Sequence, residues 1–552
     1  MAQESKSIKY ATSYREQLTV RGMIIGIIGV VIVTCSSMFI ALKASSLPFP
    51  IMFVALVSMF ALKALGRTNI NEINVTHTAM SAGSMVAGGV AFTIPTIYML
   101  YPNSELGLVK LLVITISGTM LGLIFTSLMR KQFIETSKLP YAMGQAAAEA
   151  LIVGDEGGKK AHTLFGALGF AAIWTALRDW FMKIPAVLWF GGGSWLNYGS
   201  YGGVWLSPML MSVGYLVGPI FVGVWFLGAL IGDVGILIGG QQFGFVDAST
   251  AANIKSGLGL GMMVGTGVGV FIKNILPNFK AIFGSMVSKD SIGDSIVPLR
   301  WAPILMALFA ALFVIIVDIP VVAAVITIIG VWLATAMSCQ TVGMSAINPM
   351  EVFGIFVLIL AKLCSPGITE VAAICIAAVV AVACGLVGDV MNDFKAGSIL
   401  KSSPKAQWTG ELIGGLVGAV VSVFVIMAII QAYGPSAFGN PELFPAAQAS
   451  AVAAMAGGIS HVPAFLTGLV IAAILYIVGF YPVMTLGLGV YLPFYLSFTA
   501  FIGAAIRFIL DKVYPQFERE GKGTIIGAGL LGGEAVVGVI IAMIMAVQFI
   551  AK

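Results

Sequence analysis

The chain has 552 residues, of which 59% are hydrophobic and only 10% are charged. Soluble proteins are about 25% charged and about 45–50% apolar, so this composition excludes an ordinary soluble protein and indicates a polytopic membrane protein. The net charge of +5 does not indicate a nucleic-acid partner, because basic residues of membrane proteins collect in short loops, where they set the topology. At about 20 to 25 residues for each helix, the length could provide roughly 14 to 18 spans.

The five cysteines lie in or beside apolar runs. They form no CxxC pair and no cluster with histidine at zinc spacing, so we expect small buried side chains and neither a protein-bound metal nor a cofactor. The polar tail at 1–20 precedes an apolar run without a cleavage site, and we therefore expect no removable signal peptide. The cysteines are Cys35, Cys339, Cys364, Cys375 and Cys384.

The first two predicted spans cover 21–43 and 47–66. Lysines and arginines occur in the N-terminal tail and in the loops after the second and fourth spans, whereas the intervening loops near Pro48 and Pro102 have none. Because basic loops stay in the cytoplasm, the tail at 1–20 is predicted to be cytoplasmic.

The third span begins with an unusually polar stretch at 69–89. It contains Asn71, Glu72, Asn74, His77 and Thr78, and small residues follow at its far end. Polar and ionisable groups are costly in hydrocarbon, and they mark solute or proton pathways by default. Small residues let another helix approach closely. The stretch predicts one wall of a solute pathway; a polar approach to the membrane followed by a packing seam is the alternative.

The segment 138–160 has an apolar part that is too short to span and basic residues at both ends. Such a segment predicts a re-entrant half-helix on the cytoplasmic side, which is tolerated where protein or a water-filled cavity surrounds it. Gln145 and Glu149 are four residues apart and share a helix face. That face lines the pathway or, alternatively, lies at the membrane surface. Tyr141 could pack against a substrate side chain.

The rest of the first half contains a span at 162–189, an uncharged external loop, a proline- and glycine-interrupted segment at 205–233 and a glycine-rich span to 276. The interruptions indicate a broken helix or hairpin. The basic stretch 277–300 is predicted to be a cytoplasmic connection. It divides the chain into a first transmembrane half at 21–276 and a second at 301–552.

In the second half, a charged block precedes and enters a helix near 409–418. Asp389, Asp393 and Lys395 are predicted to lie in a loop at the cytoplasmic face, as gating or helix-capping groups or as plainly solvated charges. Gln407 is a candidate for substrate binding. Glu411 lies inside the helix and could take up a proton.

Two later segments complete the candidate set. A short amphiphilic segment at 440–458 carries Gln448, and a proline-containing helix begins at Tyr491. Half-helix N-termini near Gln145 and Gln448 could hold a substrate carboxylate through the helix dipole and free N–H groups. Tyr491 could contact substrate side chains, although an interface aromatic residue is the simpler interpretation.

The order of unusual segments recurs, which predicts two internally repeated halves. Thr78 and Gly83 match Thr409 and Gly414 at a shift of 331 residues. A second match, at a shift of 285 residues, relates Pro208, Ser212 and Gly218 to Pro493, Ser497 and Gly503. Repeated halves with broken helices at their interface are the usual plan of secondary transporters. Counting basic residues favours parallel halves, while the Gln145 and Gln448 segments favour inverted ones.

Five motifs together resemble the oligopeptide transporter (OPT) family, and the resemblance covers nearly the whole chain. The most specific is DVMNDFKAGSILKSSPKAQ at 389–407. The others are NVTHTAM at 74–80, LPYAMGQAAAEAL at 139–151, the SP…GP helix at 207–219 and YLPFYLS at 491–497. The sequence looks closest to prokaryotic members, which include relatives of the yellow-stripe metal-chelate transporters.

The resemblance implies an all-α fold of about 16 transmembrane helices in the cytoplasmic membrane of a prokaryote. It also implies proton-coupled import of small oligopeptides and no enzymatic activity. Proton coupling requires a carboxyl or imidazole group, and the candidates in order are Glu149, Glu411, His77 and Glu72. The sequence leaves a homodimer open.

Two alternatives remain. The first is uptake of peptide-like metal chelates or siderophore-type compounds, in which the metal would travel inside its chelator because the chain has no Cys/His site. The stretch NINEIN before His77 replaces a longer Asn-Pro-Gly-rich approach of some eukaryotic members and leaves peptide specificity open. The remote alternative is a channel or an intramembrane enzyme, for which only the Asp389/Asp393 spacing gives any indication.

Overall fold

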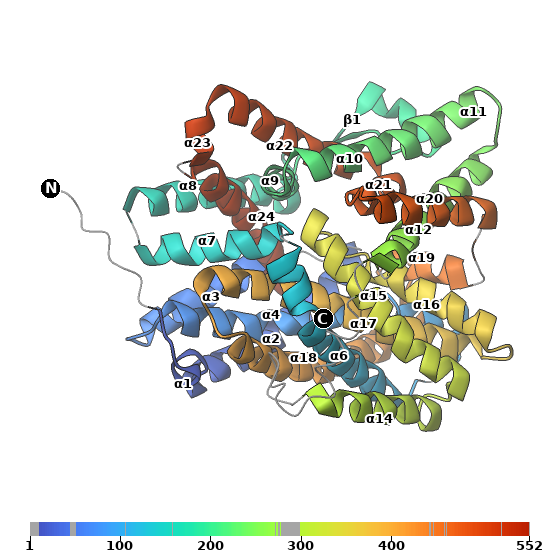
Figure 1. Cartoon of the computed structure of the whole chain (residues 1–552), viewed down its shortest axis with the longest axis horizontal. Helices are drawn as coiled ribbons and strands as arrows, with labels where there is room; N and C mark the ends of the chain where they lie inside the picture. Colours follow the sequence, from blue (N-terminus) through green and yellow to red (C-terminus); the bar gives the residue numbers. More distant parts are fainter. Residues whose placement is uncertain are drawn as a thin grey trace.

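The computed structural model describes residues 10–550 apart from 45–50, 105, 138, 157, 271, 274–275, 278–298, 441–442, 445, 457–458, 460 and 520. The predicted connection at 277–300 lies almost wholly outside the described residues. The described part is helical throughout apart from one small hairpin, which confirms the all-α prediction (Figure 1). In that hairpin, β1 pairs with β2 in antiparallel register, with Leu188 opposite Val204.

The described elements before the connection are α1 (Tyr14–Gln17), α2 (Val20–Ala44), α3 (Ile51–Ala64), α4 (Ile70–Ala91), α5 (Pro95–Leu100), α6 (Leu108–Arg130), η1 (Lys131–Thr136), α7 (Ala142–Glu156), α8 (Gly158–Thr175), η2 (Ala176–Trp180), β1 (Val187–Trp189), η3 (Phe190–Tyr198), β2 (Gly203–Trp205), α9 (Pro208–Val217), α10 (Pro219–Ala229), η4 (Leu230–Gly239), α11 (Gly240–Gln242) and α12 (Ala248–Val270).

Those after it are η6 (Leu299–Trp301), α14 (Ala302–Ile315), α15 (Val321–Ser345), α16 (Met350–Cys364), α17 (Glu370–Leu400), α18 (Pro404–Tyr433), η7 (Pro435–Ala437), α19 (Ala447–Ala456), α20 (Val462–Val478), α21 (Val483–Tyr491), α22 (Phe494–Val513), α23 (Pro515–Arg519) and α24 (Lys522–Ile550).

Eight helical stretches among the described residues are long and apolar enough to cross a membrane. Four shorter apolar helices, of 10–17 residues, add to them. These findings agree with a polytopic membrane protein, while the count of about 16 stays a prediction. The predicted span at 162–189 is shorter than expected: the helix ends at Trp180, because the chain then turns into β1.

The core is built around α17, the most deeply enclosed of the long helices. In its apolar stretch, 94% of the residues are buried inside the protein. Helices α4, α6, α7, α15, α16 and α18 all pack against it. Helices α4 (blue) and α18 (orange) also lie side by side (Figure 1). They run parallel, because Gly414 lies against Ala79 and Gly418 against Gly83 one turn later.

We expect Gly414→Ala to destabilise the α4–α18 contact strongly. A Cβ at this position would lie 1.9 Å from the Ala79 carbonyl oxygen, and a backbone atom cannot yield as a flexible side chain would. Overpacking of this kind costs about 1–3 kcal/mol. Thermal unfolding in detergent measures the loss. Gly223→Ala on α10 is the matched control, because nothing lies within 4 Å of its added Cβ. Equal unfolding midpoints for the two variants would contradict the expected close approach.

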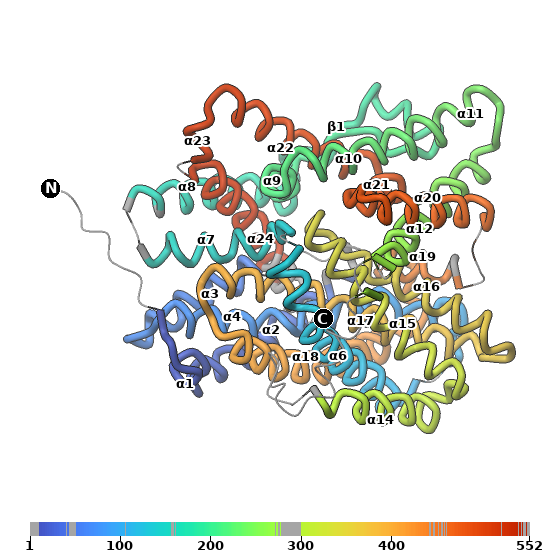
Figure 2. The backbone as a smooth tube through the Cα atoms, viewed as in Figure 1, coloured from blue at the N-terminus to red at the C-terminus, as the bar shows by residue number. Residues whose placement is uncertain are grey.

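A second packed group consists of α9, α10, α12, α20, α21 and α22, and it includes broken helices. Figure 2 shows α12 beside α20, although about 200 residues separate them along the chain. The predicted interruption within 205–233 is confirmed: α9 ends at Gly218, whose φ of 93° suits glycine, and Pro219 begins α10. A second break separates α21 from α22 at Leu492 and Pro493.

The matched helices of the predicted repeat are neighbours in space. Helix α4 packs on α18, and α9 packs on α22, where Gly214 lies against Ala500 and Gly503 against Met211. Contact between matched helices agrees with two related halves meeting at an interface. It does not test the relation itself, and the repeat stays a prediction.

Candidate functional site

Three carboxylates meet at the centre of the core, and we call Asp389, Asp393 and Glu411 the acidic cluster. The two aspartates are four residues apart and share one face of α17, while Glu411 comes from α18. One oxygen from each lies within 4.8 Å of the others. All three side chains are 0% exposed.

The acidic cluster has little compensation from its surroundings. Among the described residues, no lysine or arginine forms an ion pair with any of the three, and the carboxylate oxygens of Asp389 and Glu411 accept no hydrogen bond. Burying an unpaired charge is expensive, so such a group takes up a proton or a ligand. The cluster is therefore the strongest candidate for ion or proton binding in the described part of the chain.

Helix α4 supplies the polar wall that faces the acidic cluster. His77 Nε2 lies 3.3 Å from Asp393 Oδ1. Ser81, four residues further along the helix, donates its hydroxyl to Asp393 Oδ2 at 3.1 Å. Gln407 Nε2 donates to the Asp393 carbonyl oxygen at 2.6 Å and lies 3.5 Å from Thr78 Oγ1. The structure thus brings together residues from the polar stretch and the charged block, which are more than 300 positions apart.

The predicted loop location of Asp389 and Asp393 is wrong. Both lie inside α17, a helix of 31 residues, and the chain turns only at Lys401, whose φ is 56°. Ser403 then caps α18, and its hydroxyl accepts the Ala406 N–H. The aspartates are tolerated within a helix because they face a polar, protein-lined interior and not a loop.

Lys395 also lies within α17, and not in the predicted loop. It points away from the acidic cluster, since its ammonium group donates to the Leu139 carbonyl oxygen at 3.2 Å. It ties α17 to the chain just before α7.

The acidic cluster suits protons better than a resident metal ion. Its three carboxylates could contact a cation, but Ca²⁺ takes six to eight oxygen ligands and Mg²⁺ needs near-octahedral coordination. No other acidic, histidine or cysteine group among the described residues completes such a shell. Carboxyl groups this close readily share protons instead.

The start of α4 is held by contacts with neighbouring segments. Glu72 binds Arg21 at 2.7 Å and accepts hydrogen bonds from Thr19 and Thr68. Asn71 donates to the Leu400 carbonyl oxygen at 2.9 Å and accepts from the backbone N–H of Ala11. These contacts join the N-terminal segment, α4 and the α17–α18 turn.

Asn74 lies one turn further along α4. Its Nδ2 donates to Ser402 at 3.1 Å, while its Oδ1 has no partner among the described residues. It is therefore the member of this polar group whose oxygen is left for another ligand.

We expect Glu72→Gln to lower stability modestly and to leave proton dependence unchanged. Its partner Arg21 is 37% exposed and can be hydrated when the carboxylate is lost, so the cost should be about 1–2 kcal/mol. Thermal unfolding in detergent and the pH dependence of solute uptake check the two parts. If the Glu72→Gln variant had normal stability but its uptake no longer responded to pH, the expectation would be wrong and Glu72 would take part in proton coupling.

The other candidates lie outside the acidic cluster. Tyr141 is fully buried at the start of α7, with a φ of 46°, and donates its hydroxyl to the Cys339 carbonyl oxygen at 3.0 Å. Gln145 and Glu149 are half-buried on α7, which packs against α17 through Gly144 and Asn392. The candidates that lie elsewhere are Gln448 on α19, which packs on α5 and α16, and Tyr491 at the end of α21.

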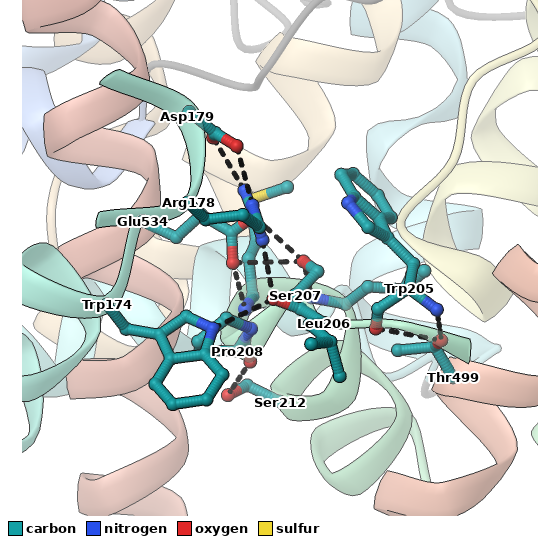
Figure 3. A network of polar contacts seen from close by, with 12 residues as sticks. Trp174, Arg178, Asp179, Trp205, Leu206, Ser207, Pro208, Ser212, Thr499 and Glu534 are labelled. Atoms are coloured by element: carbon teal, nitrogen blue, oxygen red, sulfur yellow. Dashed lines mark hydrogen bonds and ion pairs between the residues drawn. The ribbon is translucent and has the colours of Figure 1, made fainter. Parts of the chain in front are cut away.

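A second polar network joins η2, α9 and α24 (Figure 3). Arg178 binds Glu534 at 2.8 Å, and both side chains are nearly fully buried. Glu534 also accepts the Ser207 hydroxyl at 2.9 Å and the Met209 N–H at 2.7 Å, at the N-terminus of α9. These groups satisfy one another, so the network fixes the start of the broken helix and leaves no group free for a solute.

Two further buried ionisable sites were not predicted. Asp233 on η4 pairs with Lys255 on α12 at 2.7 Å and accepts the Ser200 hydroxyl at 2.8 Å. Glu351, in the first turn of α16, is 5% exposed and has no hydrogen bond or ion pair to another described residue. In the sequence, Glu351 is recognisable only as an acid in the first turn of an apolar helix. An acid at that position ordinarily indicates only a favourable interaction with the helix dipole.

Comparison with known proteins identifies the family. The sequence profile described as OPT oligopeptide transporter protein matches residues 17–545. The chain belongs to the oligopeptide transporter family. A Haemophilus influenzae protein provisionally named an oligopeptide transporter is 27% identical over 606 aligned positions, which cover 92% of each chain. The protein is thus a multi-pass membrane transporter, which confirms the family resemblance.

Family membership gives the acidic cluster its context. In a transporter, ionisable groups buried between membrane helices mark solute or proton routes. The acidic cluster of this OPT transporter lies where α4, α17 and α18 meet, and two of its members, Asp389 and Asp393, belong to the most specific motif. It is the part of the described structure best suited to respond to an ion gradient.

Proposed function

We propose that this OPT-family transporter imports small oligopeptides together with protons, and that the acidic cluster binds the coupling protons. The observation that carries the proposal is the burial of three carboxylates within 4.8 Å of one another, without a lysine or arginine partner among the described residues.

Electrostatics favours proton binding there. Two negative charges 4.8 Å apart repel by roughly 3–4 kcal/mol at an effective dielectric constant of about 20, and three such charges by roughly 10 kcal/mol. His77 can offset one charge when it is protonated. The remaining repulsion is relieved when protons bind and returns when they leave, which gives the site two states of very different energy.

The location of the acidic cluster supports coupling to a conformational change. It joins α17 to α4 and α18, so its charge state acts directly on the packing of three central helices. Broken helices near the interface of two halves are typical of secondary transporters. A plan of two halves, with about 16 helices and the N-terminus in the cytoplasm of a prokaryote, is part of this proposal.

Uptake into proteoliposomes tests the function. We expect a mixture of di- to hexapeptides to accumulate when the outside is more acidic than the inside, and a protonophore to abolish the accumulation. Peptide uptake that ignores the proton gradient would remove the coupling part of the proposal. Uptake of an iron or nickel chelate without any peptide uptake would favour the alternative substrate class.

A further inference from the structure

We propose that Ser81 positions Asp393 as the member of the acidic cluster through which protons enter and leave. The proposal rests on the proposed proton coupling and assigns the exchange of protons to one carboxyl group and its hydroxyl partner. Both side chains are 0% exposed, and their hydrogen bond joins α4 to α17 at the centre of the core.

The first observation is that one hydroxyl proton has two acceptors within reach. Ser81 Oγ lies 3.1 Å from Asp393 Oδ2 and also 3.1 Å from the backbone carbonyl oxygen of Thr78, one turn earlier on α4. A serine hydroxyl has one proton to donate and two lone pairs with which to accept, and it rotates to suit its partners. The proton of Ser81 can therefore be directed to either acceptor.

This arrangement provides Asp393 with a partner in both of its charge states. When the carboxylate is ionised, Ser81 donates its proton to Oδ2. When Oδ2 carries a proton, the acid donates to Ser81 Oγ, and the serine turns its own proton to the Thr78 carbonyl oxygen. Because a hydrogen bond joins the two side chains in either state, binding a proton leaves neither of them buried without a partner.

The other oxygen of Asp393 faces a partner that is reversible in the same way. His77 Nε2 lies 3.3 Å from Oδ1, and an imidazole nitrogen can be a donor or an acceptor. The buried acid Glu534 differs, because it is paired with Arg178, whose guanidinium group only donates and keeps its charge. A partner that always donates stabilises a permanent negative charge, whereas reversible partners suit a group that gains and loses a proton.

The two remaining members of the acidic cluster lack such a partner. The carboxylate oxygens of Asp389 and Glu411 have no hydrogen-bond partner among the described residues. One oxygen of each lies within 4.8 Å of an Asp393 oxygen, so their charges act directly on that group. Asp393 is thus the member at which a proton arrives with a hydrogen-bond partner already in place, and the other two share that proton through their proximity.

Gln407 of α18 fixes this geometry. Its Nε2 donates to the backbone carbonyl oxygen of Asp393 at 2.6 Å and lies 3.5 Å from Thr78 Oγ1. Its Oε1 lies against α17, because a Cβ at Gly397 would be only 1.9 Å from that atom. The amide therefore holds the turn of α17 that carries Asp393 beside the turn of α4 that carries Ser81.

Infrared difference spectroscopy in detergent, between acidic and alkaline buffer, tests the inference without transport. A protonated carboxyl group has a C=O stretching band whose frequency falls when the group is hydrogen-bonded. We expect wild-type protein to show a band that Asp393→Asn removes. Ser81→Ala should shift this band to higher frequency, because the acid loses its partner. Ser81→Thr, which retains a hydroxyl, should keep the band near its wild-type position.

Transport gives a second comparison. In proteoliposomes, Ser81→Ala should slow gradient-driven peptide uptake about threefold to tenfold, as expected for the loss of one hydrogen bond. It should leave the exchange of labelled for unlabelled dipeptide without a gradient unchanged, and Ser81→Thr should restore most of the driven uptake. The matched control is Ser84→Ala, which removes another fully buried hydroxyl of α4 that bonds to Ser37 and not to the acidic cluster.

The controls separate proton exchange from folding, and thermal unfolding in detergent shows whether each variant is folded. An unshifted carboxyl band in a folded Ser81→Ala variant would overturn the inference. Equal losses of driven uptake for Ser81→Ala and Ser84→Ala would overturn it as well. A shifted band in a protein whose uptake ignores the proton gradient would contradict proton coupling and leave the assignment of Asp393 intact.

Discussion

Replacing Asp389 by asparagine should abolish gradient-driven accumulation of peptide while leaving exchange in place. The asparagine side chain has nearly the same shape, but it cannot bind or release a proton at working pH. Because the aspartate side chain is 0% exposed and its oxygens accept no hydrogen bond from described residues, the substitution removes a proton-binding group without breaking a hydrogen bond. We expect the ratio of inside to outside peptide to fall at least about tenfold, toward equality.

Glu411→Gln should give the same result, because it removes another carboxylate of the same cluster. The matched control is Asp318→Asn, which replaces an acid that is 71% exposed and pairs with Lys110. Accumulation is measured in proteoliposomes under an imposed pH difference, and exchange is measured without one. Full accumulation by both cluster variants would exclude the acidic cluster as the coupling site. Loss of both accumulation and exchange would instead show that the cluster is needed for folding or substrate binding.

The polar wall of the site could be predicted from the sequence because hydrocarbon makes its residues conspicuous. His77 and Thr78 stand out in an apolar chain, and Glu411 does so within its helix. The break at Gly218 and Pro219 was equally visible, since a glycine next to a proline interrupts a helix for local steric reasons. Local signals of this kind need no knowledge of the neighbouring helices.

The environment of Asp389 and Asp393 could not be obtained in the same way. A run with two aspartates and three lysines has the composition of a loop, and only the packing of α4, α6 and α18 around α17 makes it a helix interior. Pairing is likewise a tertiary property. That Glu72 is paired with Arg21, 51 residues earlier, could not be seen in the sequence, and its role in coupling stays a prediction.

Glu351 and the pair Arg178–Glu534 also show that pairing cannot be read from the sequence. The positions of these residues were visible, but whether an acid is paired depends on a residue far away in the chain, 356 positions in the case of Glu534. A single sequence does not show which distant residues come into contact in the folded protein. The paired acid therefore resembled the unpaired one until the helices were in place.

Arg178→Leu should be among the most destabilising single substitutions in the chain. It leaves the Glu534 carboxylate buried at the start of α9 with only the Ser207 hydroxyl and the Met209 N–H as partners (Figure 3). Breaking a buried ion pair from one side costs about 3–5 kcal/mol, because the remaining charge is uncompensated. Arg178 also donates to the Leu206 carbonyl oxygen at 2.7 Å, so the β2–α9 junction would lose a second support.

Thermal unfolding in detergent should show a large loss for Arg178→Leu and a smaller one for the double variant Arg178→Leu/Glu534→Leu, which removes both charges together. Lys110→Leu is the control, since its pair with Asp318 lies at the surface and exposed pairs contribute about 0–1 kcal/mol. If the double variant were as unstable as the sum of its single variants, the two charges would not be coupled. Recovery in the double variant would instead show that the network stabilises the start of α9 through charge compensation between Arg178 and Glu534.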